Sequence, residues 1–184
     1  MARALVLLAK GFEEIEAVTV VDVLRRAGVE VQVVSIAEKE VCGSHNVTVV
    51  ADGTFQEAKM EDLDLVFLPG GMEGMERLAA DPRVGDLLGT HLQRGGKVAA
   101  ICAATCVFRA HDLIPSSTRI TSHPGVAEDL KEYSYVEDRV VMDGNIITSR
   151  GPGTAMDLAL TLAEELAGAE TRAELEAAML TGGG

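Results

Sequence analysis

Short, continuous apolar segments alternate along this chain with stretches of helical periodicity. An apolar segment that does not alternate with polar residues is typical of a strand buried on both faces, as in a parallel sheet. Parallel strands need long crossover connections, which helices usually supply. The pattern predicts an α/β sandwich with a mostly parallel central sheet, helices on both faces and right-handed crossovers. The expected strands are residues 4–9, 29–36, 63–68, 98–101 and 145–148.

Residues that are typical of helix starts and stops mark the ends of the expected helices. Residues 13–27 begin with two acids that are expected to be solvated, end with basic residues and are followed by Gly28, a common helix stop. A long helix is expected after a turn at residues 149–153, and Thr154 with Asp157 resembles a capping pair at its start. The other expected elements are helices at residues 84–94 and 103–110, and extra strands at residues 47–50 and 139–142 that are candidates for antiparallel hairpins.

The size and charge of the chain limit its architecture and its partners. Its 184 residues, 47% of them hydrophobic, suit one domain over residues 1–184, with the glycines at 182–184 as a flexible tail. A net charge of -13 repels phosphate backbones and anionic lipids, so neither nucleic acid nor a membrane is expected as a primary partner. The longest nearly uninterrupted apolar run, residues 98–108, is about half of a bilayer span. Because the first residues show no signal-cleavage pattern, we expect a cytoplasmic protein.

Cysteines and histidines give little support for a disulfide framework or a metal site. Cys42, Cys102 and Cys106 are too few for such a framework, and they contain no Cys-x-x-Cys spacing. The histidines lack metal-ligand spacing, and no glycine-rich phosphate loop follows the first strand. We therefore expect no metal and no organic cofactor. Cys42 is either an exposed, oxidisable thiol or a small apolar filler.

Cys102 directly follows the expected strand at residues 98–101 and precedes a helix of small residues. Ligand crevices of parallel sheets lie at the carboxyl ends of the strands, and a strand–turn–helix elbow holds a side chain outward there. A helix N-terminus would favour the thiolate over the thiol. The alternative is an inert cysteine buried in the core. Cys106, one turn later, is expected to pack in the core, with a resolving thiol as the second interpretation.

Other residues near the ends of these strands complete a candidate site. Glu16 heads an otherwise apolar face of the first helix, so it is either a surface acid or a buried acid whose raised pKa lets it donate a proton. Backbone N–H groups of Gly70 and Gly71 could form an oxyanion hole with that of Ala103, unless the glycines only make a turn. His123 is either a loop residue or an imidazole that orients substrate or moves protons.

Five motifs, in order along the chain, resemble those of the ThiJ/PfpI superfamily. The resemblance extends over essentially the whole chain and is to the branch that contains the Parkinson-disease-associated protein deglycase and its bacterial homologues. It implies a flavodoxin-like three-layer sandwich, a homodimer and a redox-sensitive cysteine at a nucleophile elbow. The motifs are Ala-Lys-Gly-Phe-Glu-Glu-Ile-Glu-Ala at 9–17, Leu-Pro-Gly-Gly at 68–71, Ala-Ala-Ile-Cys-Ala at 99–103, His-Pro at 123–124 and Thr-Ser-Arg-Gly-Pro-Gly-Thr at 148–154.

The resemblance also implies roles for individual residues. Carried over by position, Cys102 is the nucleophile, Glu16 the protonated acid that hydrogen-bonds its sulfur, and His123 the nearby imidazole. Activities of the family include glutathione-independent glyoxalase action on methylglyoxal, removal of early glycation adducts from proteins, and oxidation-dependent chaperone behaviour. The backbone donors of the family match Gly70, Gly71 and Ala103.

The chain departs from the family pattern at three places. One is the tail after Leu180, which is Thr-Gly-Gly-Gly, so a contact made by an ordered C-terminus is not expected. Animal members carry an arginine near the site, from the dimer partner, where this chain has His45. Arg26 is retained. Because His45 stands in place of the other arginine, an anion contact at the dimer interface is expected to be weaker. Thr105 and Cys106 replace a commoner Pro-Thr pair and add a second sulfur.

Two functions follow as hypotheses. In the first, Cys102 detoxifies α-oxoaldehydes such as methylglyoxal, free or as adducts on glycated proteins, through a thiohemiacetal with Glu16 as proton carrier. In the alternative, Cys102 is oxidised to a sulfinate without turnover, and the protein is a redox sensor or an oxidation-activated chaperone. Both hypotheses need the same reactive thiol.

Overall fold

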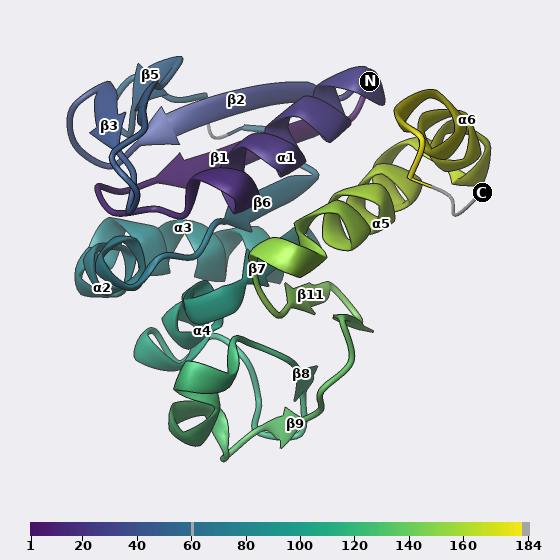
Figure 1. Cartoon of the computed structure of the whole chain (residues 1–184). Helices are drawn as coiled ribbons and strands as arrows, with labels where there is room; N and C mark the ends of the chain where they lie inside the picture. The colour runs from purple at the N-terminus through teal and green to yellow at the C-terminus, as the bar shows by residue number, and fades with distance from the viewer. Residues whose placement is uncertain (60, 182–184) are drawn as a thin grey trace.

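A seven-stranded sheet forms the centre of the computed structural model, which describes residues 1–59 and 61–181 (Figure 1). Its strands are β1 (Arg3–Leu8), β2 (Glu30–Ser35), β5 (Gly53–Thr54), β6 (Leu65–Leu68), β7 (Lys97–Ile101), β10 (Val140–Asp143) and β11 (Ile146–Ser149). Their order is β10-β11-β7-β6-β1-β2-β5, and all neighbours are parallel except β10 and β11. The expected α/β class with a mostly parallel sheet is confirmed, whereas the expected tail at 182–184 lies outside the described residues.

Helices cover both faces of this sheet (Figure 1). They are α1 (Glu14–Arg26), α2 (Met72–Ala80), α3 (Pro82–Gln93), α4 (Cys106–Ala110), α5 (Ala155–Ala167) and α6 (Ala169–Met179). One apolar core joins Val6 and Leu8 of β1 to α1 and α5, and the other joins Leu5 and Leu7 of the same strand to α2, α3 and α4. Because both faces of the central strands are buried, their sequences are continuously apolar.

The remaining apolar segments form short strands, either at the edge of the main sheet or outside it. β3 (Glu40–Cys42) and β4 (Thr48–Val50) form an antiparallel hairpin, and β10 pairs antiparallel with β11, as expected for the two extra strands. β8 (Arg119–Ile120) and β9 (Ser134–Tyr135) form a parallel pair that the sequence pattern does not predict. Among the described residues, no helix is long and apolar enough to cross a bilayer.

Three of the expected helices or their surroundings differ in the structure. The long helix expected after residue 153 is divided at Gly168 into α5 and α6. α2 has no counterpart among the expected helices, because only Gly74 and Leu78 of its residues are buried. The Asp81 side chain accepts a hydrogen bond from the N–H of Arg83 and so begins α3 immediately. The expected helix at 103–110 begins instead as a 3-10 turn, η1 (Cys102–Thr105), and α4 follows it.

The expected capping pair of Thr154 and Asp157 is wrong. Thr154 Oγ1 accepts hydrogen bonds from the N–H groups of Arg150 and Gly151 at 3.1 and 3.0 Å, and Asp157 Oδ2 accepts one from Arg139 at 2.6 Å. The backbone N–H groups of the turn after β11 take part neither in the hydrogen bonds of the sheet nor in those of α5. The threonine hydroxyl therefore satisfies the backbone donors of this turn rather than those of the helix.

Gly71 lies where the loop after β6 crosses the loop after β1. Its φ is +91°, a conformation that residues with a side chain rarely adopt. A Cβ at this position would overlap the carbonyl oxygen of Gly11 and lie 2.8 Å from the nitrogen of Glu13. The atoms that a Cβ would meet are backbone atoms, which cannot move aside as the end of a flexible side chain can. Only glycine therefore fits where the two loops cross.

Gly71→Ala should therefore destabilise the protein much more than Gly95→Ala. Gly95 also has a positive φ, +81°, but no atom lies within 4 Å of a Cβ built there. The control should lose about 1 kcal/mol from backbone strain, and Gly71→Ala at least about 3 kcal/mol because the overlap adds to the strain. Urea unfolding measures both values. Equal losses in the two variants would contradict the crossing as the cause.

Candidate active site

The carboxyl ends of β1, β6 and β7 meet at one edge of the sheet and bring the predicted residues together. Gly70 follows β6, Cys102 follows β7, and Glu16 lies in the first turn of α1, which follows β1. The N–H of Gly70 donates a hydrogen bond to Glu16 Oε2 at 2.7 Å. A Cβ on Gly70 would lie 2.5 Å from that oxygen and 2.6 Å from Cys102 Cβ. Glu16 and Cys102 thus approach each other across a glycine that leaves them room.

Cys102 occupies a strained elbow between β7 and η1. Its φ is +63°, in the left-handed region that residues other than glycine seldom adopt. Such strain is concentrated at functional sites, and this turn is the geometry that holds a nucleophile outward at the end of a strand. Cys102 is partly buried and packs against both apolar cores.

The sequence left two alternatives for Glu16, a surface acid or a buried acid, and in the structure it is buried. It is 0% exposed, and its Oε1 is buried without a hydrogen-bond partner among the described residues. Burial raises the pKa of Glu16 to about 7, and the charge of Glu13 contributes, whereas the N–H of Gly70 and the thiol of Cys102 oppose the rise. A substantial fraction of this carboxyl is therefore protonated at neutral pH.

The expectation that a helix N-terminus ionises Cys102 is wrong. The residue begins a four-residue 3-10 turn rather than an α-helix, so no long helix dipole points at the sulfur. Burial, followed by the charge of Glu16, raises the pKa of Cys102 to about 12. The N–H groups of Ala103 and Gly71 act in the opposite direction, since both hydrogen-bond the sulfur and stabilise its negative charge.

Glu16 and Cys102 therefore titrate as a pair. The pair loses its first proton near pH 7, the pKa of Glu16, and holds the second proton far more tightly. With these pKa values the charge resides mainly on Glu16 and the remaining proton on the sulfur, and the form with the proton on Glu16 and the charge on the sulfur is the minor one. In that minor form Glu16 has a proton to donate, and the thiolate lies beside the N–H groups of Gly71 and Ala103.

Of the three predicted backbone donors, Gly70 has a different role. Its N–H is already bonded to Glu16 Oε2, and therefore positions the acid. The N–H groups of Gly71 and Ala103 remain directed at the sulfur. The oxyanion hole expected from three donors thus has two in this state of the site.

His123 is attached to the elbow through its backbone. Its N–H donates to the carbonyl oxygen of Cys102 at 3.3 Å, and its exposed ring lies beside Gly151. The N–H of Gly125 donates to His123 Nδ1 at 3.0 Å. Because Nδ1 accepts this bond, the neutral ring carries its proton on Nε2, which is free to donate.

Arg26 and His45 do not reach the sulfur within one chain. Arg26 lies ten residues after Glu16 on α1, about 15 Å along the helix axis, and bonds Asp22 at 2.7 Å. His45 lies in the β3–β4 hairpin loop with its side chain 74% exposed, and its Nδ1 lies 3.1 Å from Glu14 Oε2. Their expected place at a dimer interface stays a prediction.

Glu13 and Glu14 are buried, so the expectation of two solvated acids is wrong. Glu13 caps α1 by accepting the N–H of Glu16 at 2.7 Å, a role that its spacing of three residues could have indicated. Glu14 accepts the N–H groups of His45 and Val47. Although burial opposes it, these bonds lower the pKa of Glu14 to about 2. Ligand atoms of Glu13, Glu14 and His45 lie within 4.8 Å of one another, a cluster that these bonds explain as the anchor of the hairpin loop.

The other two cysteines lie outside the crevice. Cys106 is partly buried against the core formed with α2, α3 and α4, and burial raises the pKa of its thiol to about 11. This placement agrees with the packing interpretation. Cys42, at the end of β3, is also partly buried, with its sulfur 3.6 Å from the carbonyl oxygen of Gly43.

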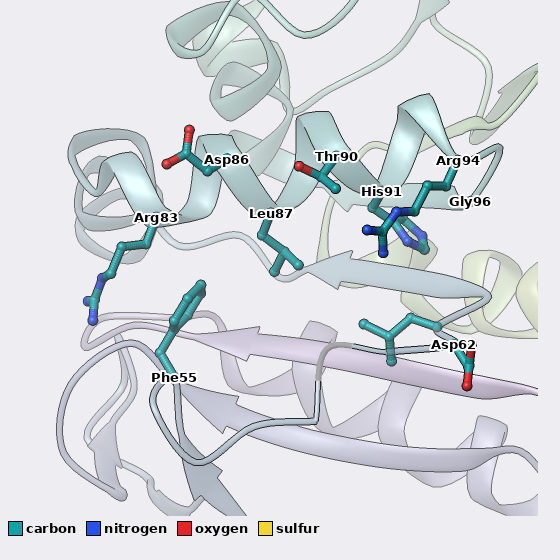
Figure 2. A pocket seen from close by; sticks show the side chains of 10 residues that line it. Phe55, Asp62, Arg83, Asp86, Leu87, Thr90, His91, Arg94 and Gly96 are labelled. Carbon is teal, nitrogen blue, oxygen red and sulfur yellow. The ribbon is translucent and has the colours of Figure 1, made fainter.

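A cavity of about 530 Å³ lies away from this crevice, between α3 and the loop after β5 (Figure 2). Its charged groups are of both signs, and no cysteine lines it. The guanidinium of Arg83 is bonded to Asp81 and lies 4.9 Å from the ring centre of Phe55. Cys102 and Glu16 therefore do not belong to this cavity.

The raised pKa of Glu16 predicts a specific dependence of stability on pH. Its folded-state pKa of about 7 exceeds the ordinary value of 4.5, so its contribution is fully present below pH 4.5 and is lost as the pH rises through 7. The loss should reach about 3 kcal/mol. Urea unfolding of wild type and Glu16→Gln at pH 5, 6, 7 and 8 isolates this group, because the amide does not titrate. A stability difference that is constant with pH would contradict the buried acid.

Comparisons with known proteins show the family of this chain. The DJ-1/PfpI family model matches residues 2–165. The chain is 45% identical over 183 residues to the Parkinson disease protein 7 homolog of Danio rerio, covering 97% of this chain and 96% of the relative. It is 37% identical over 170 residues to the glutathione-independent glyoxalase DJR-1.2 of Caenorhabditis elegans, covering 91% and 90%.

Solved structures give the same result. The crystal structure of Drosophila melanogaster DJ-1beta superposes with a TM-score of 0.94 at 44% identity, covering 97% of both chains. That of oxidized Toxoplasma gondii DJ-1 superposes with a TM-score of 0.91 at 34% identity, covering 98% of both. Fold, sequence and the elbow cysteine together show that this chain belongs to the DJ-1/PfpI family.

Proposed function

We propose that this protein converts α-oxoaldehydes such as methylglyoxal into 2-hydroxy acids, using Cys102 as the nucleophile. The observation that carries the proposal is the pair of Cys102 and Glu16, in which a buried acid with a pKa of about 7 lies beside an elbow sulfur. A group that titrates near neutral pH can both donate and accept a proton within one catalytic cycle. The relative from Caenorhabditis elegans that is named a glutathione-independent glyoxalase supports the same activity.

The first step joins the sulfur to the substrate. The Cys102 thiolate adds to the aldehyde carbon, and Glu16 gives its proton to the carbonyl oxygen, so the product is a neutral hemithioacetal. The N–H groups of Gly71 and Ala103, which hydrogen-bond the sulfur, lie close to the oxygen on which charge develops. His123 Nε2–H is the donor for the second oxygen of the substrate.

The second step moves one hydrogen between neighbouring carbons. Glu16, now a carboxylate, removes the hydrogen of the former aldehyde carbon as a proton and returns a proton to the adjacent keto carbon, while the hydroxyl proton of the hemithioacetal passes to the former keto oxygen. The product is a thioester of the 2-hydroxy acid on Cys102. Water then cleaves the carbon–sulfur bond, which releases the acid and restores the thiol. One water is consumed and no oxidant is needed.

The same chemistry extends to early glycation adducts on proteins. An aminocarbinol or a hemithioacetal formed between methylglyoxal and a protein side chain is in equilibrium with the aldehyde that Cys102 attacks. Consumption of the aldehyde at the elbow would reverse the adduct. The open position of His123, which is exposed, is compatible with a substrate attached to a larger molecule.

A second candidate function is favoured by the related structure titled oxidized Toxoplasma gondii DJ-1. Two equivalents of a peroxide would oxidise the Cys102 thiol to a sulfinic acid and release two waters. Its oxygens would accept hydrogen bonds from Gly71, Ala103 and protonated Glu16. In this case the protein is a redox sensor or an oxidation-activated chaperone without turnover.

An exposed apolar surface supports the proposal of a homodimer. Ile15 and Val18 of α1 are 57% and 50% exposed, and Val47 and Val50, before and at the end of β4, are 54% and 68% exposed. A cavity of about 210 Å³ between α1 and β4 is bordered by Val18 and Val50. Contiguous exposed apolar side chains of this kind mark association surfaces.

Turnover of methylglyoxal should depend on Cys102 and Glu16 but not on Cys106. In thiol-free buffer with a chelator, Cys102→Ser and Glu16→Gln should each lower kcat/KM by at least about 100-fold, because one removes the nucleophile and the other the proton carrier. Cys106→Ser is the matched control, since its thiol packs away from the crevice, and should stay within about twofold.

Other outcomes of this experiment decide between the candidates. Full activity of Cys102→Ser would overturn the glyoxalase proposal. Stoichiometric consumption by wild type, without further turnover, would support the redox candidate. Mass spectrometry after mild peroxide then tests that candidate, which requires oxidation of Cys102 before Cys42 and Cys106.

Charged substitutions in the apolar surface should dissociate the dimer. Val18→Asp and Val50→Asp each place a carboxylate in the proposed contact, which costs binding free energy through an unpaired buried charge. Met142→Asp is the control, because Met142 is an exposed apolar residue of β10, outside this surface. Sedimentation velocity should give a dimer for wild type and Met142→Asp and monomers for the other two. Monomeric wild type at micromolar concentration would refute the dimer.

A further inference from the structure

Two buried threonine hydroxyls hold the backbone of Thr121 from both sides. The hydroxyl of Thr105, in η1, donates a hydrogen bond to the carbonyl oxygen of Thr121 at 3.1 Å. The N–H of Thr121 donates to Thr148 Oγ1, in β11, at 2.9 Å. All three threonines are 0% exposed. Residues from the elbow and from a central strand thus fix one peptide unit on each side of Thr121.

These bonds are needed because Thr121 lies just beyond a strand. β8 ends at Ile120, so the ladder of β8 and β9 does not extend to the backbone groups of Thr121. A buried N–H or C=O without a partner costs free energy comparable to a lost hydrogen bond. The Thr121 hydroxyl itself has no partner among the described residues. The attachment therefore depends on Thr105 and Thr148 and not on the side chain of Thr121.

The segment held in this way carries His123. Tyr135 donates its hydroxyl proton to the carbonyl oxygen of Ser122 at 3.2 Å, and His123 N–H donates to Cys102 O at 3.3 Å. The bond from Gly125 N–H to His123 Nδ1 then sets the ring. Every residue from Thr121 to His123 is thus bonded to an element that forms the site or its support.

We propose that Thr105 and Thr148 are positioning residues for His123. Their hydroxyls fix the segment 121–125 against the elbow, where His123 N–H is bonded to Cys102 O, and in the proposed reaction Nε2–H of His123 is the donor to the adduct on Cys102. This inference rests on the proposed function, because it assigns His123 a donor role in that reaction.

The experiment compares valine and serine at each of the two positions. Thr105→Val and Thr148→Val keep the shape of the side chain and remove the hydroxyl, whereas Thr105→Ser and Thr148→Ser retain it. Thr118→Val is the matched control, since Thr118 is a buried threonine just before β8 whose hydroxyl makes no hydrogen bond to the described residues. The readouts are kcat and KM for methylglyoxal, thermal unfolding, and amide hydrogen exchange of peptides that cover residues 119–126.

The valine variants should lower kcat by about tenfold or more and change KM by less than about twofold, because misplacement of a catalytic group affects the transition state more than binding. Exchange should accelerate at 121–125 and not in the central strands. The serine variants and Thr118→Val should resemble wild type. The two positions are tested separately, so if the valine variant at one of them fails to fold, the valine and serine variants at the other still test the hydroxyl.

Four results would overturn the inference, and they are distinguishable. Faster exchange with unchanged kcat would show a clamp without a catalytic role. Equal losses of kcat in the serine and valine variants would show that the hydroxyls are not responsible. Absence of turnover in wild type would refute the proposed function and the positioning role with it, whereas unchanged exchange in the valine variants of an active enzyme would refute the clamp alone.

Discussion

The buried carboxyl of Glu16 is the constraint around which the site is arranged. One oxygen is bonded to the N–H of Gly70, and the other is buried without a partner among the described residues. The group joins the start of α1 to the loop after β6 and to the elbow after β7. Removing a carboxyl from water requires that these three chain segments fit closely, which is why glycines stand at 70 and 71.

Much of this fold could be predicted from the sequence, because β1, β6 and β7 are buried on both faces and are therefore continuously apolar. Cys102 and Glu16 could be predicted for a related reason, since the ends of parallel strands converge at one edge. α2 could not be predicted, because only Gly74 and Leu78 of this helix are buried and its sequence therefore shows little of an apolar face.

The errors at the site have one physical cause. Acids at the start of a helix usually face solvent, and a thiol at a helix N-terminus is usually ionised, so both expectations followed local rules. In the structure, the hairpin loop covers Glu14, and burial dominates the pKa of Cys102. Burial depends on segments distant in the sequence, whereas the rules use only the neighbours along the chain.

The pair of Glu16 and Cys102 has a consequence for how oxidation of Cys102 affects catalytic activity. The crevice accommodates one negative charge, whether it is carried by the sulfur, by the carboxylate or by oxygens added to the sulfur. A sulfinate would occupy that single place permanently, together with the proton of Glu16 that stabilises it. A molecule whose Cys102 is oxidised to a sulfinate could then no longer catalyse the reaction, so oxidation would lower the number of active molecules.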